Sequence, residues 1–326
     1  FQGPLGGIFT TTLASSPPVV AFDPQGPLLP GERVQATFSS QVLDENGSPV
    51  HPYVWEFRAA VAGGSGNFTN SGQSLSSPSG WRVALGDLDG DGDLDALQAD
   101  YSGNSSQVWL NDGVGIYTSS QTLATTRATD VALGDLDADG DLDVLVAQMD
   151  QPLMVWLNDG SGHFTDTSQP LGTLESYAVN LGDLDGDGDL DAFVATYNPQ
   201  PDRSFFHGGS GVFSDRSQTL GRAYAVGAAL GDIENDGDLD AYVANCHGSG
   251  NDKLWLNDGQ GQFSDSGQTI DGLCSYEADF GDVDGDGDLD VVVANGAAGG
   301  QPNQLYINDG HGTLSNSGQN LGSYQN

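Results

Sequence analysis

Aspartate residues recur in this sequence in short runs whose spacing suits the binding of a cation. In the first run, Asp87, Asp89, Asp91 and Asp95 occupy positions 1, 3, 5 and 9 of a nine-residue segment, and Gly92 follows position 5. Alternate side chains of a tightly curled loop point to its inside, and glycine permits the sharp turn. Ca²⁺ takes six to eight oxygen ligands at about 2.3–2.6 Å, from carboxylates, carbonyl groups and water. The run therefore predicts a calcium loop, with the carbonyl group of position 7 as a further ligand.

Other cations fit these runs less well. None of the runs contains histidine or cysteine, which argues against a transition metal, and Mg²⁺ is rarely held by a crowded all-protein cage. A solvated acidic turn would explain a single run, but the same spacing occurs five times. We predict about five Ca²⁺ ions, one per loop. The predicted ligand residues are Asp87, Asp89, Asp91, Asp93 and Asp95; Asp135, Asp137, Asp139, Asp141 and Asp143; Asp183, Asp185, Asp187, Asp189 and Asp191; Asp232, Glu234, Asp236, Asp238 and Asp240; and Asp282, Asp284, Asp286, Asp288 and Asp290.

Two of the five loops depart from the pattern. The fourth loop has Glu234 at position 3 and Asn235 at position 4, where the other loops have glycine or alanine. Because glutamate is longer than aspartate, we expect a weaker calcium site there, or one that uses an additional water. The second loop has Ala138 in place of the glycine at position 4, and we expect this change to be harmless.

The aspartate runs mark a repeat of about fifty residues. Their first aspartates are Asp87, Asp135, Asp183, Asp232 and Asp282, which gives intervals of 48, 48, 49 and 50 residues. In the first unit, four short apolar runs are separated by Gly, Asp, Asn and Ser, and we expect strands at Val83–Asp87, Leu94–Ala99, Gln107–Leu110 and Gly115–Ser119. Four antiparallel strands per repeat of this length are typical of a β-propeller blade, so the sequence predicts an all-β propeller.

An aromatic residue recurs in the third strand of each unit. Blades bury their faces by stacking on one another, so we expect this column to pack between blades rather than to bind a ligand. The column consists of Trp109, Trp156, Phe205, Trp255 and Tyr306.

The chain divides into two predicted parts. Residues 1–60 read as a partial immunoglobulin-like β segment, with strands near residues 19–22, 28–38 and 53–57. Residues 61–326 read as the propeller, which begins with a half-blade near residues 61–80 that has no aspartate loop. Five full repeats follow near residues 81–130, 131–178, 179–227, 228–277 and 278–326. Three ways of closing the ring remain open: a longer natural chain, closure of five blades on themselves, or strands from another chain.

The five aspartate runs resemble the loops of FG-GAP and VCBS repeats, which form integrin-α-like propellers. The resemblance covers about residues 60–326 and rests on the pattern Asp-x-Asp-x-Asp-Gly-x-x-Asp, as in Asp87 to Asp95. It implies calcium in the loops that join the first two strands of each blade, all on one face of the disc. The family commonly has seven blades, whereas this sequence has five full copies. The N-terminal segment is similar to the end of a bacterial immunoglobulin-like domain.

Two cysteines, Cys246 and Cys274, allow one disulfide or two separate thiols. With the loops placed as the resemblance implies, both cysteines fall on the face opposite the calcium loops, near neighbouring blades. The resemblance therefore favours a Cys246–Cys274 disulfide, which agrees with an oxidising compartment.

Composition excludes several classes of partner. Eight Lys and Arg stand against 46 Asp and Glu, giving a net charge of −38, which repels nucleic acid and acidic lipid. No run of 18 apolar residues exists, so we expect no membrane insertion. Extracellular calcium modules bind at about 10⁻⁴–10⁻³ M, and only calcium outside the cell reaches that level. We therefore expect a secreted or cell-surface protein.

These features favour an adhesion or assembly module at the cell surface, acting through protein or glycan contacts. Self-association by strand addition, leading to filaments, is part of this hypothesis. A calcium-dependent lectin is the alternative, and a non-catalytic domain of a larger secreted enzyme is a second one. We do not expect an enzyme, because the five histidines are scattered and no catalytic motif is present. His207, which replaces the asparagine of the third repeat's turn, is expected to be a solvated turn residue.

Overall fold

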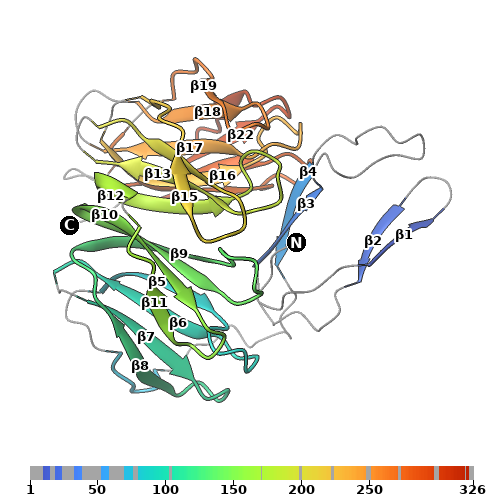
Figure 1. The fold of residues 1–326 in the computed structure, drawn as a ribbon. Coiled ribbons are helices and arrows are strands. Elements are labelled where there is room, and N and C mark those ends of the chain that lie inside the picture. The colour runs from blue at the N-terminus through green and yellow to red at the C-terminus, as the bar shows by residue number, and fades with distance from the viewer. Residues whose placement is uncertain are drawn as a thin grey trace.

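The computed structural model describes the polypeptide from residue 10 to residue 322, with gaps. The described ranges are 10–14, 19–23, 33–38, 53–58, 70–75, 80–102, 105–169, 171–197, 200–221, 224–246, 251–270, 273–296, 301–319 and 321–322. All regular elements in these ranges are β-strands (Figure 1). Within the same ranges, no helix has the length and apolar character needed to cross a membrane.

Five antiparallel units, here called blades 1 to 5, follow one another along the chain (Figure 1). Blade 1 contains β5 (Gly80–Gly86), β6 (Asp95–Asp100), β7 (Ser106–Asn111) and β8 (Tyr117–Leu123). Blade 2 contains β9 (Ala128–Gly134), β10 (Asp143–Asn158) and β11 (Phe164–Asp166), and β10 serves as both its second and its third strand. Blade 3 contains β12 (Leu171–Gly182), β13 (Asp191–Thr196), β14 (Arg203–His207) and β15 (Phe213–Asp215).

The last two blades repeat the same order. Blade 4 contains β16 (Ala225–Gly231), β17 (Asp240–Asn245), β18 (Lys253–Asn257) and β19 (Phe263–Asp265). Blade 5 contains β20 (Ser275–Gly281), β21 (Asp290–Asn295), β22 (Gln304–Asn308) and β23 (Leu314–Asn316). These sheets confirm the predicted all-β fold of four-stranded repeats, in which each aspartate run joins the first strand of a blade to the second.

The second strand of a blade is the most deeply buried. In β13 and β17 every residue is buried, and their sequences are short and mostly apolar, Asp-Ala-Phe-Val-Ala-Thr and Asp-Ala-Tyr-Val-Ala-Asn. Each lies between two strands of its own sheet and is covered on both faces by neighbouring blades. Such a strand needs no polar face, which explains why its apolar residues form a run rather than an alternating pattern.

The hydrophobic core lies between blades. One cluster joins Leu184 and Phe193 of blade 3 to Trp255 and Phe263 of blade 4, and the other clusters join neighbouring blades in the same way. The predicted packing of the aromatic column is confirmed, because four of its members are buried. They are Trp156, Phe205, Trp255 and Tyr306. Trp109 of blade 1 is only partly buried.

A glutamine at the end of each unit links one blade to the next. The amide of Gln121 in blade 1 accepts from the backbone N–H of Phe164 in blade 2 (2.7 Å) and donates to the carbonyl group of the same residue (2.8 Å). Gln218 bonds in the same way to Phe263 of blade 4, whereas Gln169 and Gln268 accept from Phe213 and Leu314 and donate to the carbonyl groups of Gly211 and Gly312. Gln73, which precedes blade 1, bonds to the start of β8 and the turn before it: it donates to the Gly115 carbonyl (2.6 Å) and accepts from the Tyr117 N–H (2.8 Å).

The first strands lie side by side and form the inner wall of the blade row. β5 packs on β9, β9 on β12, β12 on β16 and β16 on β20. Among the described residues β20 does not pack on β5 in this way, yet Arg82 of β5 reaches Glu277 of β20 at 2.5 Å. Val83 and Leu85 of β5 remain 59% and 58% exposed. The row therefore curves until its two ends approach each other, where Arg82 and Glu277 join them.

Four N-terminal strands precede the blades. β1 (Thr10–Ala14) pairs with β2 (Val19–Asp23), and β3 (Arg33–Phe38) pairs with β4 (Tyr53–Arg58). Strands near the three predicted positions are confirmed. The immunoglobulin-like assignment and the domain boundaries stay predictions, and residues 61–69 of the expected half-blade lie outside the described residues.

Candidate functional site

Each aspartate run forms a loop between the first and second strands of its blade. The glycine after position 5 has a φ of +94° at Gly92, and its counterparts have values between +97° and +100°. The counterparts are Gly140, Gly188, Gly237 and Gly287. Only glycine adopts such angles readily, so the predicted role of this glycine in the sharp turn is confirmed.

Position 4 also lies in the left-handed region. Gly90 has a φ of +74°, and Ala138 takes the same position in blade 2 with a φ of +63°. An L-residue in this conformation brings its Cβ close to the following carbonyl oxygen, at a cost of roughly 1–2 kcal/mol. The second loop nevertheless brings its carboxylates together as the glycine-containing loops do, and the expectation that Ala138 is harmless stays a prediction. Asn235 of blade 4, with a φ of +57°, is better suited because asparagine tolerates this region.

The aspartate at position 9 fastens the loop to the blade. In blade 1 the two carboxylate oxygens of Asp95 accept from the N–H of Leu88 (2.8 Å) and from the N–H of Asn111 in β7 (2.7 Å). The equivalent residues of blades 2 to 5 make the same pair of bonds and, like Asp95, are fully buried. Burial raises the pKa of Asp95 to about 6, that of Asp143 to about 7, and those of Asp191 and Asp240 to about 8.

The aspartate at position 1 closes the loop from the other side. Asp87 accepts from the N–H groups of Gly90 (2.9 Å) and Gly92 (3.1 Å), and burial raises its pKa. Each carboxylate oxygen has two lone pairs, so these bonds leave acceptor capacity for a cation. The backbone thus fixes the carboxylates at positions 1 and 9 without using all of their acceptor sites.

Four of the loops bring three carboxylates together, with ligand oxygens within 4.8 Å of one another. The groups are Asp87, Asp89 and Asp95; Asp135, Asp137 and Asp143; Asp183, Asp185 and Asp191; and Asp282, Asp284 and Asp290. These are positions 1, 3 and 9 of each loop. The predicted position-5 ligands, Asp91, Asp139, Asp187 and Asp286, do not belong to these groups.

Two oxygens in these groups test whether a cation fits. The Oδ1 atoms of Asp137 and Asp185 are buried and have no hydrogen-bond donor among the described residues. A buried carboxylate oxygen without a partner is unfavourable, and a hard divalent cation is the partner that suits it. Three converging carboxylates with oxygen as the only donor element match Ca²⁺ rather than a transition metal. The residues present therefore fit a calcium ion.

The fourth loop differs from the others. Asp232, Glu234 and Asp240 do not form a group of this kind among the described residues. Burial and the adjacent Asp236 raise the pKa of Glu234. The expectation of a weaker calcium site, or of one that uses an additional water, stays a prediction.

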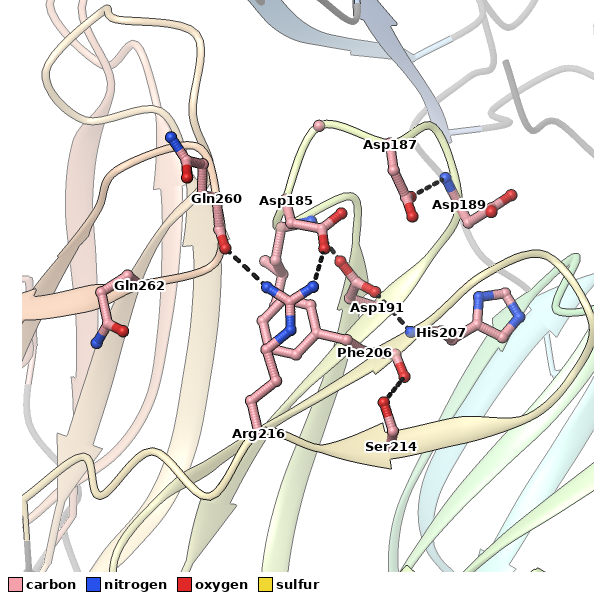
Figure 2. Close-up of polar contacts among 12 residues, drawn as sticks. Asp185, Asp187, Asp189, Asp191, Phe206, His207, Ser214, Arg216, Gln260 and Gln262 are labelled. Carbon is pink, nitrogen blue, oxygen red and sulfur yellow. Dashed lines mark hydrogen bonds and ion pairs between the residues drawn. The ribbon is translucent and has the colours of Figure 1, made fainter.

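An arginine that sequence reasoning missed, directly after β15, contacts the third loop (Figure 2). Arg216 contacts the Oδ2 atom of Asp185 at 2.5 Å and donates to the Gln260 carbonyl of blade 4 at 2.9 Å. Its guanidinium lies 3.9 Å from the centre of the Phe206 ring. The signal in the sequence is an arginine where the other repeats have serine or threonine, as in Thr167 and Ser266.

His207 contradicts its predicted role as a solvated turn residue. It is buried, its ring stacks on Phe213 at 4.8 Å, and its Nε2–H donates to the Leu136 carbonyl in the second loop. Asparagine makes the equivalent bond elsewhere, as when Asn158 donates to the Leu88 carbonyl at 2.8 Å. Each of these side chains ties the third strand of one blade to the loop of the preceding blade.

The two cysteines lie at the other end of the sheets. The structure joins Cys246, directly after β17, to Cys274, directly before β20, by a disulfide. The bond therefore links blade 4 to blade 5 at the end of the strands away from the aspartate loops.

Comparisons with known proteins extend these observations. The family model for the FG-GAP-like repeat matches residues 87–146, 135–194, 183–243, 232–293 and 282–325. No curated protein matches the sequence.

Solved structures show the same fold at low sequence identity. A lectin of Agrocybe aegerita, described as recognising non-reducing terminal N-acetylglucosamine, is 17% identical with a TM-score of 0.53, covering 96% of this chain and 87% of its own. A candidate 6-phosphogluconolactonase of Bacteroides uniformis is 14% identical with a TM-score of 0.54, covering 74% of this chain and 81% of its own. Because the matched repeats run from residue 87 to residue 325, the chain belongs to the family of FG-GAP-like repeat proteins.

Proposed function

We propose that this chain is a calcium-stabilised β-propeller that acts outside the cell as an adhesion or assembly module. The observation that carries the calcium part of the proposal is the pair of buried, unpartnered oxygens on Asp137 and Asp185, each within a group of three carboxylates. Calcium would be held by positions 1, 3 and 9 in four of the loops and would neutralise carboxylates that otherwise repel one another. The net charge of −38 and the affinity range of extracellular calcium modules support a location outside the cell.

Calcium binding would stiffen more than one blade at a time. The carbonyl at position 2 of a loop accepts from the next blade, as Leu88 does from Asn158 and Leu184 from Asn257 (both 2.8 Å). An ordered loop therefore holds the neighbouring blade in register. A rigid disc with its metal loops on one face leaves the other face for contacts with protein or glycan.

Carbohydrate binding is the second candidate function. The Agrocybe aegerita lectin shares the fold over 96% of this chain, so a propeller of this size can serve as a lectin. The candidate lactonase shows that the same fold also occurs in a protein described as an enzyme. We infer binding rather than catalysis here, because the clustered carboxylates are engaged in bonds that shape the loops.

Self-association is a further part of the proposal. The exposed Val83 and Leu85 on β5 and Val292 on β21 (37% exposed) give the two ends of the blade row apolar surface that a second chain would cover. Sedimentation of the calcium-loaded protein at increasing concentration tests this part. A single monomeric species at all concentrations would remove it.

Thermal unfolding with calcium and with a chelator tests the calcium part of the proposal. A ligand that binds only the folded state stabilises it by mass action, so we expect the melting temperature to fall sharply on chelation. In the variant that combines Asp137→Asn with Asp185→Asn, the difference between the two conditions should shrink. Asp112→Asn, in an exposed turn outside the loops, is the control and should keep the full difference. A wild-type melting temperature that is the same with calcium and with the chelator would contradict the proposal.

A further inference from the structure

Every first strand contains an irregularity five residues before its last residue. In β5, Gly80 and Arg82 pair with the successive residues Asp100 and Ala99 of β6, so Trp81 has no partner in the ladder. The same break occurs in the other four blades, and the unpaired residues are Trp81, Thr129, Tyr177, Val226 and Tyr276. A β-bulge of this kind bends the strand and redirects a side chain, and bulges are common beside functional sites.

These bulges lie on the face opposite the aspartate loops. Each loop follows the last residue of a first strand, whereas each bulge lies five residues before that last residue. Three of the five bulged residues are aromatic, and two of those are well exposed: Trp81 at 48% and Tyr276 at 44%. The aromatic residues between blades behave differently, since Trp156 and Phe205 are 7% and 3% exposed. Burial in the core therefore does not explain Trp81 and Tyr276.

Aromatic rings from several blades meet on this face. The Trp81 ring of blade 1 lies 6.4 Å from that of Tyr177 in blade 3, although blade 2 separates them in the sequence. Tyr101 lies 5.2 Å from Trp81, Tyr197 lies 5.4 Å from Tyr177, and Tyr224 lies 5.4 Å from Tyr197. Together with Tyr276 of blade 5, these residues are called the aromatic rim: Trp81, Tyr101, Tyr177, Tyr197, Tyr224 and Tyr276.

Two arginines beside the aromatic rim are paired with carboxylates. Arg82 contacts Glu277 at 2.5 Å and lies 3.9 Å from Asp130. Arg127 contacts Asp150 at 2.6 Å. Because both arginines already have carboxylate partners and the whole chain carries a charge of −38, an anionic ligand is disfavoured. The same pairing leaves these carboxylates poorly placed to attract a cation.

Arg127 also supports the rim itself. It donates to the Tyr101 hydroxyl at 2.7 Å and lies 5.2 Å from the centre of the Tyr101 ring. This holds the ring of Tyr101 beside that of Trp81.

An uncharged sugar matches this chemistry. One face of a pyranose ring carries C–H groups that pack on an exposed aromatic ring, while its hydroxyl groups need nearby donors and acceptors. Trp and Tyr supply an apolar body with a polar tip, which serves both needs. Rings contributed by blades 1, 3, 4 and 5 offer more than one stacking position, so several linked sugars can be engaged at once.

We infer that the aromatic rim binds an uncharged oligosaccharide on the face away from the calcium loops. This inference rests on the proposed function in its glycan-binding form and locates the contact surface. It predicts that Trp81, the most exposed ring of the rim, dominates the affinity.

The experiment uses the full chain saturated with calcium. Cellohexaose, mannohexaose and chitohexaose are titrated while heat and tryptophan fluorescence are recorded, with hexagalacturonate and tetramethylammonium as charged probes. We expect at least one neutral hexasaccharide to bind, and Trp81→Ala or Tyr276→Ala to weaken it by roughly tenfold or more. Val212→Ala is the matched control, because Val212 is an exposed apolar residue (61%) in a turn outside the rim.

The outcomes separate this inference from the proposed function. The inference would be overturned if no neutral sugar bound at millimolar concentration, or if only the charged probes bound. It would also be overturned if both rim variants bound the neutral sugar as tightly as the wild type. Each variant must keep the calcium-dependent melting temperature of the wild type, which shows that it is folded. If chelation leaves that temperature unchanged, the proposed calcium role fails, whatever the sugars do.

Discussion

Asp202 offers a sharp test of how burial controls the stability of this fold. It lies between the second and third strands of blade 3 and is 4% exposed. Its Oδ1 atom accepts from the backbone N–H of Thr196 at 2.8 Å and from the Thr196 hydroxyl at 3.5 Å. In blade 5 the same bond is made by a neutral residue, since the N–H of Asn295 donates to Asn303 Oδ1 at 2.9 Å. The substitution Asp202→Asn therefore keeps the acceptor and removes only the buried charge.

The size of the effect follows from the pKa. Burial raises the pKa of Asp202 from 3.8 to about 7. A difference of about 3 units, at 1.36 kcal/mol per unit, gives an upper limit of about 4 kcal/mol. The folded state holds the proton more tightly than the unfolded state does. The contribution of Asp202 to the free energy of unfolding of the wild type is therefore greatest below pH 3.8. It falls as the pH rises towards 7 and stays low above pH 7.

Urea unfolding between pH 4 and pH 8, in calcium-saturated buffer, measures the difference between Asp202→Asn and the wild type. We expect the variant's advantage in the free energy of unfolding to grow from about zero near pH 4 to a plateau above pH 7. Carboxylates that both proteins share cancel in this difference. Asp112→Asn, which changes an exposed carboxylate, should give no such rise. A difference that does not vary with pH, or a variant less stable than the wild type at pH 8, would refute the reasoning.

Three further predictions concern single residues. Ala138→Gly should raise the free energy of unfolding by about 1 kcal/mol. Glycine removes the strain of the left-handed φ, and this gain exceeds the entropy that glycine loses on folding. A variant that denaturant unfolding shows to be no more stable than the wild type would contradict this. Arg216→Ser should strengthen calcium binding at the third loop severalfold, since it removes a positive charge from Asp185; calorimetry showing weaker binding at one site would contradict it. Cys246→Ser should lower the free energy of unfolding by about 2–4 kcal/mol under non-reducing conditions, because it opens the link between blades 4 and 5; equal stability of the two proteins would show that the disulfide is not formed.

The sequence was sufficient for the features that depend on local spacing. The interval between aspartate runs predicted the repeat, and the strand pattern of the first unit agrees with β5 to β8 within a few residues. In four of the five loops the carboxylates at positions 1, 3 and 9 come together as the spacing indicated, whereas those at position 5 do not belong to these groups. Each of these features lies within one repeat, where neighbouring residues determine the geometry.

Features that depend on contacts between blades were not predictable in this way. His207 looked like a turn residue because its bond to Leu136 crosses to the preceding blade. Arg216 gave no signal of a contact, because the carbonyl group of Gln260 to which it donates lies in blade 4. Trp81 and Tyr177 meet only because the row of blades curves. The φ of Ala138 was overlooked for another reason, since its significance depends on the backbone conformation of position 4 rather than on the aspartate spacing.

Counting the calcium ions held by the protein tests the central claim most directly. The chain is dialysed to equilibrium against millimolar ⁴⁵Ca²⁺, and the bound ions per molecule are measured. If the aspartate loops hold calcium, the count should approach one ion per loop, with the Glu234 loop filling last. Retention of no ions above background, by a protein that stays folded, would contradict the account.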